Sequence, residues 1–181
     1  MRYLVPHVPF PAPLPNLRVH RVWLAVHAGA AGVALVLGPF QFLRKLREQR
    51  VAVHRAVGWV YCSAVLLGGV AALPLSVRAA FGWVTASGFM TLAVVWLAVT
   101  AVGVRTAVRG QYAAHGRWML RSYALTAAAI TLRIYLPISQ TMGLRFDVSY
   151  RAIAWMCWVG NLAAVEVYLA WRRRRAVGAR R

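Results

Sequence analysis

The sequence predicts an all-α integral membrane protein, built as a bundle of about five transmembrane helices. Of its 181 residues, 61% are hydrophobic, which exceeds the share of about 45–50% that is usual in soluble domains. Five apolar stretches each approach the roughly 20 residues that a helix needs to cross a bilayer. The net charge of +19 comes almost wholly from arginines that lie between these stretches, so the charge is compatible with helices buried in lipid.

The five stretches are expected to form helices in chain order, and the short connections between them favour antiparallel neighbours. They cover residues 22–42, 56–75, 82–104, 118–138 and 153–171. The first two are rich in glycine and alanine, which lets two helix backbones approach closely in lipid. Pro39 and Pro74 lie near the ends of these two stretches, where a kink or a helix end is tolerated. The fourth stretch contains Arg133, and the fifth runs into a basic tail.

The basic residues predict the orientation of the bundle, because Lys and Arg concentrate on the cytoplasmic side of membrane proteins. Three segments on one side of a five-helix chain are rich in them: Arg44, Lys45, Arg47, Arg50 and Arg55; Arg105, Arg109, Arg117 and Arg121; and Arg172 to Arg175 with Arg180 and Arg181. The N-terminus is therefore expected outside and the C-terminus in the cytoplasm. We therefore expect the chain to have three parts. They are a proline-rich extracytoplasmic arm over residues 1–20, a single transmembrane domain over 21–171 and a basic cytoplasmic tail over 172–181.

Composition also indicates where the protein resides and what it contacts. A charge of +19 suits either nucleic acid or an anionic lipid surface. Because the basic residues alternate with long apolar runs, we expect contact with the anionic lipids of a bilayer and no binding of nucleic acid. Richness in Ala, Val and Arg with a single lysine is typical of a GC-rich bacterial genome. These features predict a multi-pass protein of a bacterial plasma membrane.

Two histidines predict a polar layer near the cytoplasmic face. His54 opens the second helix and His115 opens the fourth, so the two lie at one depth. Neutral imidazoles on two helices of a bundle are suitable axial ligands for haem iron, which makes this pair the candidate metal ligands of a haem b. Arg55, Arg117 and Arg121 would then pair with the haem propionates. In the alternative interpretation, all of these residues only form hydrated helix ends.

A second polar layer is expected near the outer face, formed by His27 and Arg133. An ionised side chain costs roughly 2.5–3.5 kcal/mol at the centre of a membrane helix and usually marks a function. The two residues lie at similar depth by helical rise, so they are candidate ligands for an anionic head group, a quinone or a haem carboxylate. Gln41 is a candidate for lining the inner site. The alternative is that Arg133 extends its guanidinium to the surface and that His27 hydrogen-bonds a backbone carbonyl.

The fourth helix would connect the two layers. His115 and Arg133 are 18 residues apart, which is five helical turns, and Ser122 and Thr126 fall near the same stripe. A polar stripe along one face of a membrane helix should point into the bundle rather than toward lipid. We therefore expect Arg133 to face the other helices.

The remaining polar residues indicate structural roles and identify no reaction. Glu166 in the fifth helix is expected to form an ion pair with Arg121 or Arg117, and Asn161 is expected to join helices by hydrogen bonds. We find no phosphate-binding glycine loop, no zinc-site spacing and no pair of catalytic carboxylates in the sequence. Whether the protein is an enzyme is left open.

Several motifs together resemble a known family. They are Gly38-Pro-Phe-Gln-Phe42, His54-Arg-Ala-Val-Gly58 with Tyr61, His115-Gly-Arg-Trp-Met119, Arg121-Ser-Tyr-Ala-Leu125, Leu132-Arg133, and Trp155-Met-Cys-Trp158 with Asn161. Over about residues 22–170 the sequence resembles the bacterial predicted membrane proteins called domain of unknown function 2306. The resemblance implies a small polytopic membrane protein with His27, His54, His115 and Arg133 at motif positions, and it implies no reaction.

A looser similarity is to cytochrome b561-type bundles, which hold haem between histidines on neighbouring helices. This chain departs from that pattern, because it has three helix-associated histidines rather than four in two pairs. Three functions are therefore compatible with the sequence: a protein that binds a haem or another anionic or quinone-like ligand, a structural or accessory subunit without catalytic activity, and a small-solute transporter that uses the groove between the first and fourth helices.

Overall fold

The computed structural model describes residues 21–178, and within that range every regular element is a helix. In chain order these are α1 (Arg21–Leu37), η2 (Pro39–Phe42), α2 (Arg44–Gln49), α3 (Val51–Val77), α4 (Trp83–Val108), α5 (Tyr112–Thr126), α6 (Ala128–Thr141) and α7 (Phe146–Gly178). Four helical stretches of the described chain are long and apolar enough to cross a membrane: Arg21–Phe42, Val51–Val77, Trp83–Val108 and Phe146–Ala176. The predicted all-α membrane bundle is confirmed, while the arm predicted over residues 1–20 lies outside the described residues.

The prediction of one continuous fourth helix over residues 118–138 is wrong. The chain instead forms α5 and α6, which meet at Ala127. The amide of Ala127 still bonds the carbonyl of Tyr123 at 2.9 Å, but the carbonyl of Ala124 accepts the side-chain amide of Asn161 on α7 at 3.2 Å. A side chain that inserts into the hydrogen-bond ladder of a helix interrupts and bends it, and this accounts for the break.

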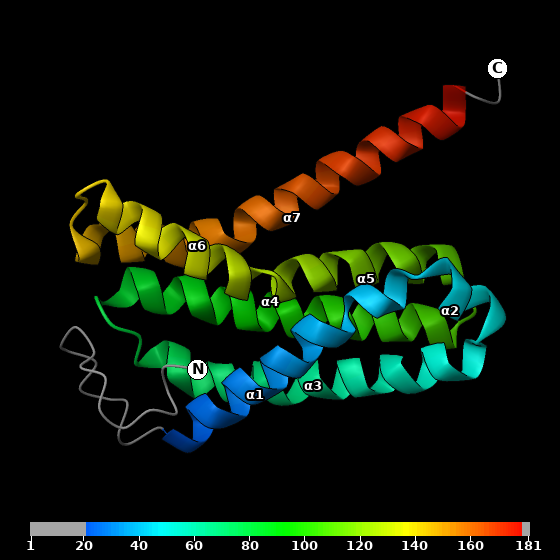
Figure 1. The fold of residues 1–181 in the computed structure, drawn as a ribbon, viewed down its shortest axis with the longest axis horizontal. Helices are drawn as coiled ribbons and strands as arrows, with labels where there is room; N and C mark the ends of the chain where they lie inside the picture. The colour runs from blue at the N-terminus through cyan, green and yellow to red at the C-terminus, as the bar shows by residue number, and fades with distance from the viewer. Residues whose placement is uncertain (1–20, 179–181) are drawn as a thin grey trace.

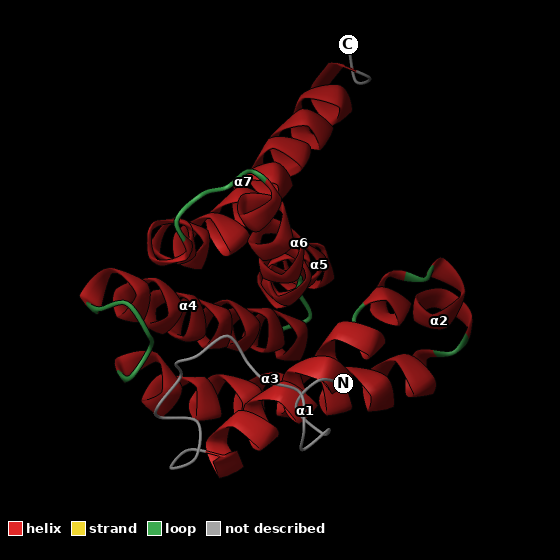
Figure 2. Cartoon of the chain, turned by 60° about the vertical axis from the view of Figure 1, so that its left-hand side comes forward, coloured by secondary structure: helices red, strands yellow, loops and turns green. Residues whose placement is uncertain are grey.

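The helices pack mainly against their neighbours in the chain (Figure 1). α3 lies between α1 and α4, α5 packs on α4, and α6 packs on α7. The beginning of α7 runs beside the bundle, whereas its C-terminal end projects away from the other helices, as the two views in Figures 1 and 2 agree. The core lies where α3, α4, α5 and α7 meet; its most buried large side chains include Tyr61, Val65, Trp96, Leu125 and Cys157.

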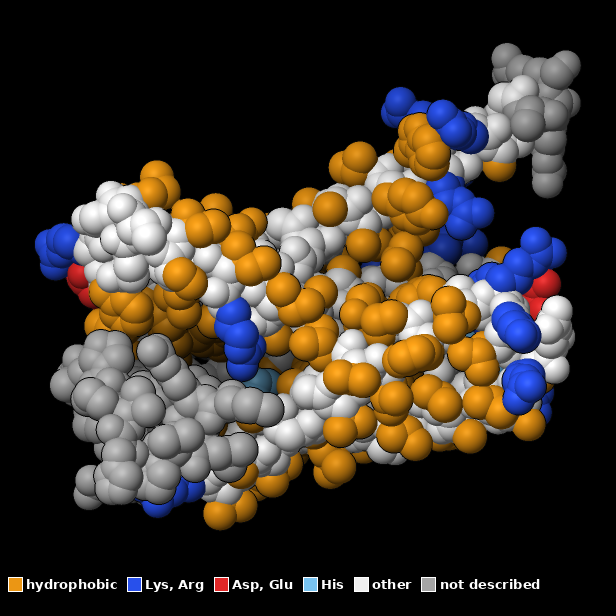
Figure 3. All heavy atoms as spheres, viewed as in Figure 1, with side chains coloured by type: hydrophobic (Ala, Val, Ile, Leu, Met, Phe, Trp, Pro, Cys, Tyr) orange, Lys and Arg blue, Asp and Glu red, His pale blue; other side chains and the backbone are white. Residues whose placement is uncertain are grey.

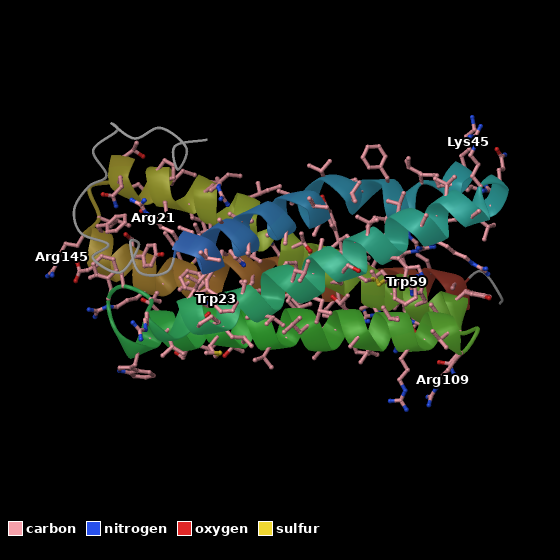
Figure 4. The ribbon with its side chains drawn as sticks, turned by 90° about the horizontal axis from the view of Figure 1, so that it is seen from below. Arg21, Trp23, Lys45, Trp59, Arg109 and Arg145 are labelled. Atoms are coloured by element: carbon pink, nitrogen blue, oxygen red, sulfur yellow. The ribbon has the colours of Figure 1, made fainter. Side chains whose placement is uncertain are left out.

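The two ends of the bundle differ in charge. Figure 4 shows Lys45, Trp59 and Arg109 toward one end and Arg21 and Arg145 toward the other. The first end, here called the basic end, contains α2, the connection between α4 and α5, and the arginines of the last turns of α7. In Figure 3 apolar side chains cover the middle of the visible face, and basic side chains gather toward the ends.

Glycines let α1 and α3 approach closely, as the small-residue pattern predicts. A Cβ atom added at Gly68 on α3 would lie 3.4 Å from the amide nitrogen of Ala31 on α1. The same addition at Gly38 would overlap the ring of Tyr123 on α5, whose hydroxyl donates to the carbonyl of Leu35 at 3.3 Å. Gly29 has open space around it instead, so only part of the glycine content of α1 serves packing.

Candidate functional site: a polar cluster at the basic end

At the basic end, a buried amide from η2 lies against the face of α3 that carries an imidazole. Gln41, in η2, is only 8% exposed. Its side-chain oxygen lies against Gly58, where an added Cβ would be 3.2 Å away. His54 precedes Gly58 by four residues and therefore lies on the same helix face, one turn away. Glycine at position 58 thus makes room for the Gln41 amide next to the turn that carries His54.

A third polar residue, His115, lies in the first turn of α5. Its Nδ1 lies 2.8 Å from the carbonyl oxygen of Gly103 on α4. Because a carbonyl only accepts, Nδ1 carries the proton and the lone pair of the neutral ring remains on Nε2. His54 and His115 each lie in the first turn of their helix, and Gln41 lies in η2 just before α2. These three residues are called the basal polar site below.

Two polar atoms of the basal polar site are buried without a hydrogen-bond partner. They are Nε2 of Gln41 and Nδ1 of His54. Within residues 21–178, only Oγ1 of Thr85 and Nε1 of Trp158 share this condition. A buried unpaired group costs about 1–3 kcal/mol, which makes these two atoms candidates for contact with a ligand or a bound water.

The arginines proposed around the basal polar site differ in their surroundings. Arg55 and Arg117 are exposed. Arg121 is held by Glu166 of α7 through bonds of 2.5 Å and 2.8 Å, and its guanidinium lies 4.8 Å from the ring centre of Trp118. The expected ion pair of Glu166 with Arg121 is therefore present. Arg55 and Arg117 are the cations left for a ligand at this site.

The two residues of the predicted outer layer have separate partners. Nδ1 of His27 lies 2.8 Å from the carbonyl oxygen of Gly68, and the guanidinium of Arg133 donates to the carbonyl of Ala129 on its own helix at 2.8 Å. Arg133 is exposed. The prediction that Arg133 points into the bundle is wrong, because the break at Ala127 ends the regular helical register that was counted from His115. The alternative interpretation of a surface-directed arginine and a carbonyl-bonded histidine describes the geometry.

Beyond the basal polar site, a circuit of hydroxyl groups occupies the core. Tyr61 on α3 lies 2.8 Å from the Ser122 hydroxyl and 3.0 Å from the Thr126 hydroxyl, both on α5. From α4, the indole of Trp96 donates to Thr126 at 3.0 Å, and the Thr100 hydroxyl lies 2.7 Å from that of Ser122. All five side chains are at most 5% exposed. We call these five residues the hydroxyl circuit.

The donors and acceptors of the hydroxyl circuit can be assigned one by one. Thr100 donates to the carbonyl of Trp96 at 2.8 Å, so Ser122 must donate to Thr100, since each hydroxyl has one proton. Tyr61 then donates to Ser122, and the single proton of Thr126 has two acceptors within reach, the Tyr61 oxygen and the Ser122 carbonyl, each at 3.0 Å. The indole N–H of Trp96 donates to Thr126, so the chain starts and ends at one residue. Every member is satisfied, which indicates a structural element joining three helices.

Asn161 joins the two halves of the broken span. Its amide nitrogen donates to Ala124 on α5, and its amide oxygen accepts from the Thr131 hydroxyl on α6 at 3.1 Å. Asn161 thereby acts as the interhelical link that the sequence indicated. The sequence did not reveal the hydroxyl circuit, although the presence of Ser122 and Thr126 one turn apart was a signal for part of it.

Within the described residues, no group of three or more His, Cys, Asp or Glu side chains is arranged to hold a metal ion by itself.

A family model described as "Predicted membrane protein (DUF2306)" matches residues 24–169. The comparisons with curated proteins and with solved structures return no match.

Proposed function

The chain belongs to the DUF2306 family of predicted membrane proteins, and on that premise we propose that it is a ligand-binding protein of a bacterial plasma membrane. The ligand binds at the basal polar site, formed by Gln41, His54 and His115. The observation that carries this proposal is the pair of buried, unpartnered atoms, Nε2 of Gln41 in η2 and Nδ1 of His54 in α3.

The chemistry of these atoms defines the ligand. The amide nitrogen of Gln41 only donates, so its partner is an acceptor such as a carbonyl or carboxylate oxygen. His54 donates from Nδ1 to the same kind of oxygen when that nitrogen carries the proton. A quinone offers such oxygens on a ring whose apolar tail is soluble in the bilayer. A bound water satisfies the same atoms, and the protein would then be an accessory subunit.

A haem b is the second candidate, and the hydrogen bond of His115 favours it. Metal-ligating histidines usually donate their other ring nitrogen to a carbonyl or carboxylate, as Nδ1 of His115 does to Gly103. His115 and His54 would hold the iron from two helices, while Arg55 and Arg117 would pair with the propionates. Bound haem would supply one-electron redox chemistry.

The orientation belongs to the same proposal. We assign the basic end to the cytoplasm, because arginines concentrate there in α2, in and around the connection between α4 and α5, and in the last turns of α7. The N-terminus then lies outside, and the basal polar site faces the cytoplasmic leaflet.

One preparation tests both ligand classes. The full-length protein is purified in mild detergent, its quinones are extracted and quantified, and its reduced-minus-oxidised spectrum and iron content are measured. A quinone ligand is expected at about one per chain in the wild type, lost in Gln41→Leu and retained in the control His27→Ala. A haem ligand gives a sharp α band and about one iron per chain, both lost in His115→Ala. Protein that is folded and free of quinone and iron would refute ligand binding by either class.

A further inference from the structure

A groove runs between α3 and α4 on the outside of the bundle, away from the basal polar site. Its volume is about 380 Å³. Trp59, Cys62 and Leu66 line it from α3, and Leu97, Ala101 and Arg105 line it from α4. On each helix these residues recur every three or four positions, which places them in one row along the axis. From Leu97 to Arg105 the groove follows α4 for about 12 Å.

The two ends of the groove differ. Leu97 packs so tightly on α3 that a Cβ added at Gly69 would lie 2.6 Å from its Cδ2, and this contact narrows the end nearer mid-membrane. At the other end, Arg105 lies in the last turn of α4 and is exposed. Trp59 stands beside this mouth on α3 with 63% of its surface exposed. An apolar slot therefore opens toward an arginine at the membrane surface.

No acidic side chain neutralises Arg105. The sequence contains three acids, and each is paired with another arginine: Glu48 with Arg44, Asp147 with Arg145 and Glu166 with Arg121. Arginine has no uncharged form in proteins, and its planar fork of donors matches the oxygens of a phosphate. In a bilayer, the phosphate nearest to such a residue belongs to a lipid.

We propose that this groove binds an anionic phospholipid, with one acyl chain between α3 and α4 and its phosphate on Arg105. The walls match an acyl chain because they are almost wholly apolar, and the length of the groove follows the membrane normal as a chain does. The charge at the mouth selects an anionic over a zwitterionic head group. Arg105 and Gly103 are two residues apart and so face opposite sides of α4. The lipid site is therefore independent of His115.

Native mass spectrometry of the full-length protein tests the assignment. The detergent-purified protein is mixed with equal amounts of phosphatidylglycerol and phosphatidylcholine that carry identical acyl chains, and the bound lipids are counted. Phosphatidylglycerol is expected to dominate the first bound lipid. Arg105→Gln should reduce this preference about five-fold, the factor typical of one arginine near an anionic surface, and Arg105→Lys should retain it.

Two further variants distinguish lipid binding in the groove from attraction of lipids by the net positive charge of the protein. Ala101→Trp fills the groove and should remove the first lipid of either head group. Arg174→Gln, in the last turns of α7, removes one charge at the same end and should leave the preference unchanged. Equal effects of Arg105→Gln and Arg174→Gln would show that only net charge matters, and unchanged lipid occupancy in Ala101→Trp would show that the groove holds no chain. Either result would overturn the proposal.

Discussion

Removing the phenolic oxygen of Tyr61 should open the hydroxyl circuit and loosen the contact of α3 with α5. Tyr61 is 1% exposed, so water does not replace the missing group. In Tyr61→Phe, Ser122 loses its donor. Thr126 loses its acceptor but can turn to the carbonyl of Ser122, already at 3.0 Å. One buried oxygen is therefore left without a donor, and both hydrogen bonds between Tyr61 and α5 are lost.

The magnitude follows from those two losses. Interhelical hydrogen bonds in membrane proteins average about 0.6 kcal/mol and reach about 1.7, whereas a buried unpaired group costs about 1–3 kcal/mol. Because Thr126 has a second acceptor, we expect the lower part of the second range. Tyr61→Phe should lower the free energy of unfolding by about 1–1.5 kcal/mol.

The assay is equilibrium unfolding of the purified protein in mixed detergent micelles with increasing dodecyl sulfate, followed by far-ultraviolet circular dichroism. Tyr112→Phe is the matched control, because that ring is 69% exposed and should lose less than about 0.5 kcal/mol. Ser122→Ala completes a double-mutant cycle with Tyr61→Phe, and the coupling should be about 0.5–1.5 kcal/mol. A coupling of zero would refute the circuit, because independent side chains give additive effects.

Three other perturbations have definite expected outcomes. Gly38→Ala places a methyl group in the ring of Tyr123 and should destabilise the protein by about 1–3 kcal/mol, whereas Gly29→Ala, in open space, should be neutral or stabilising in the same unfolding assay. Asn161→Leu removes both bonds across the helix break and should lower stability by about 1–2 kcal/mol; a change below 0.5 kcal/mol would contradict the bridging role. A cysteine tag after Arg175 should be protected from a membrane-impermeant thiol reagent in whole cells, and its labelling would reverse the proposed orientation.

The sequence predicted the architecture well where hydropathy alone decides it. Four of the expected segments coincide with helices long and apolar enough to span, because lipid forces every backbone group into a helix. Prediction from the sequence failed at residues 118–138, because the side chain of Asn161, which is distant in the sequence, bonds a carbonyl of this helix. The shared depth of His54 and His115, expected from helical rise, stays a prediction. Counting turns through Ala127 misplaced Arg133, since periodicity assumes an unbroken helix.

The hydroxyl circuit shows the other limit of prediction from sequence. Each of its residues is a common core or packing residue when read alone, and only the relative rotation of α3, α4 and α5 brings the hydroxyls within 3.0 Å. The pairing of Glu166 with Arg121 was predictable because the chain has few acids and many arginines. Few acidic residues leave few possible ion pairs to consider, whereas the many hydroxyl residues leave too many possible hydrogen bonds to choose among.

The helix break has a consequence for how the protein enters the membrane during synthesis. The carbonyl of Ala124 obtains its partner from Asn161, which is translated 37 residues later. Until then the bond that interrupts the helix at Ala124 is absent, and α5 carries His115, Arg117 and Arg121, which are costly to leave in lipid without a partner. We infer that the translocon retains these two helices until α7 emerges, and that the three enter the bilayer as one unit. Crosslinking of nascent chains to the translocon would show this as release of α5 and α6 only after residue 161 has left the ribosome.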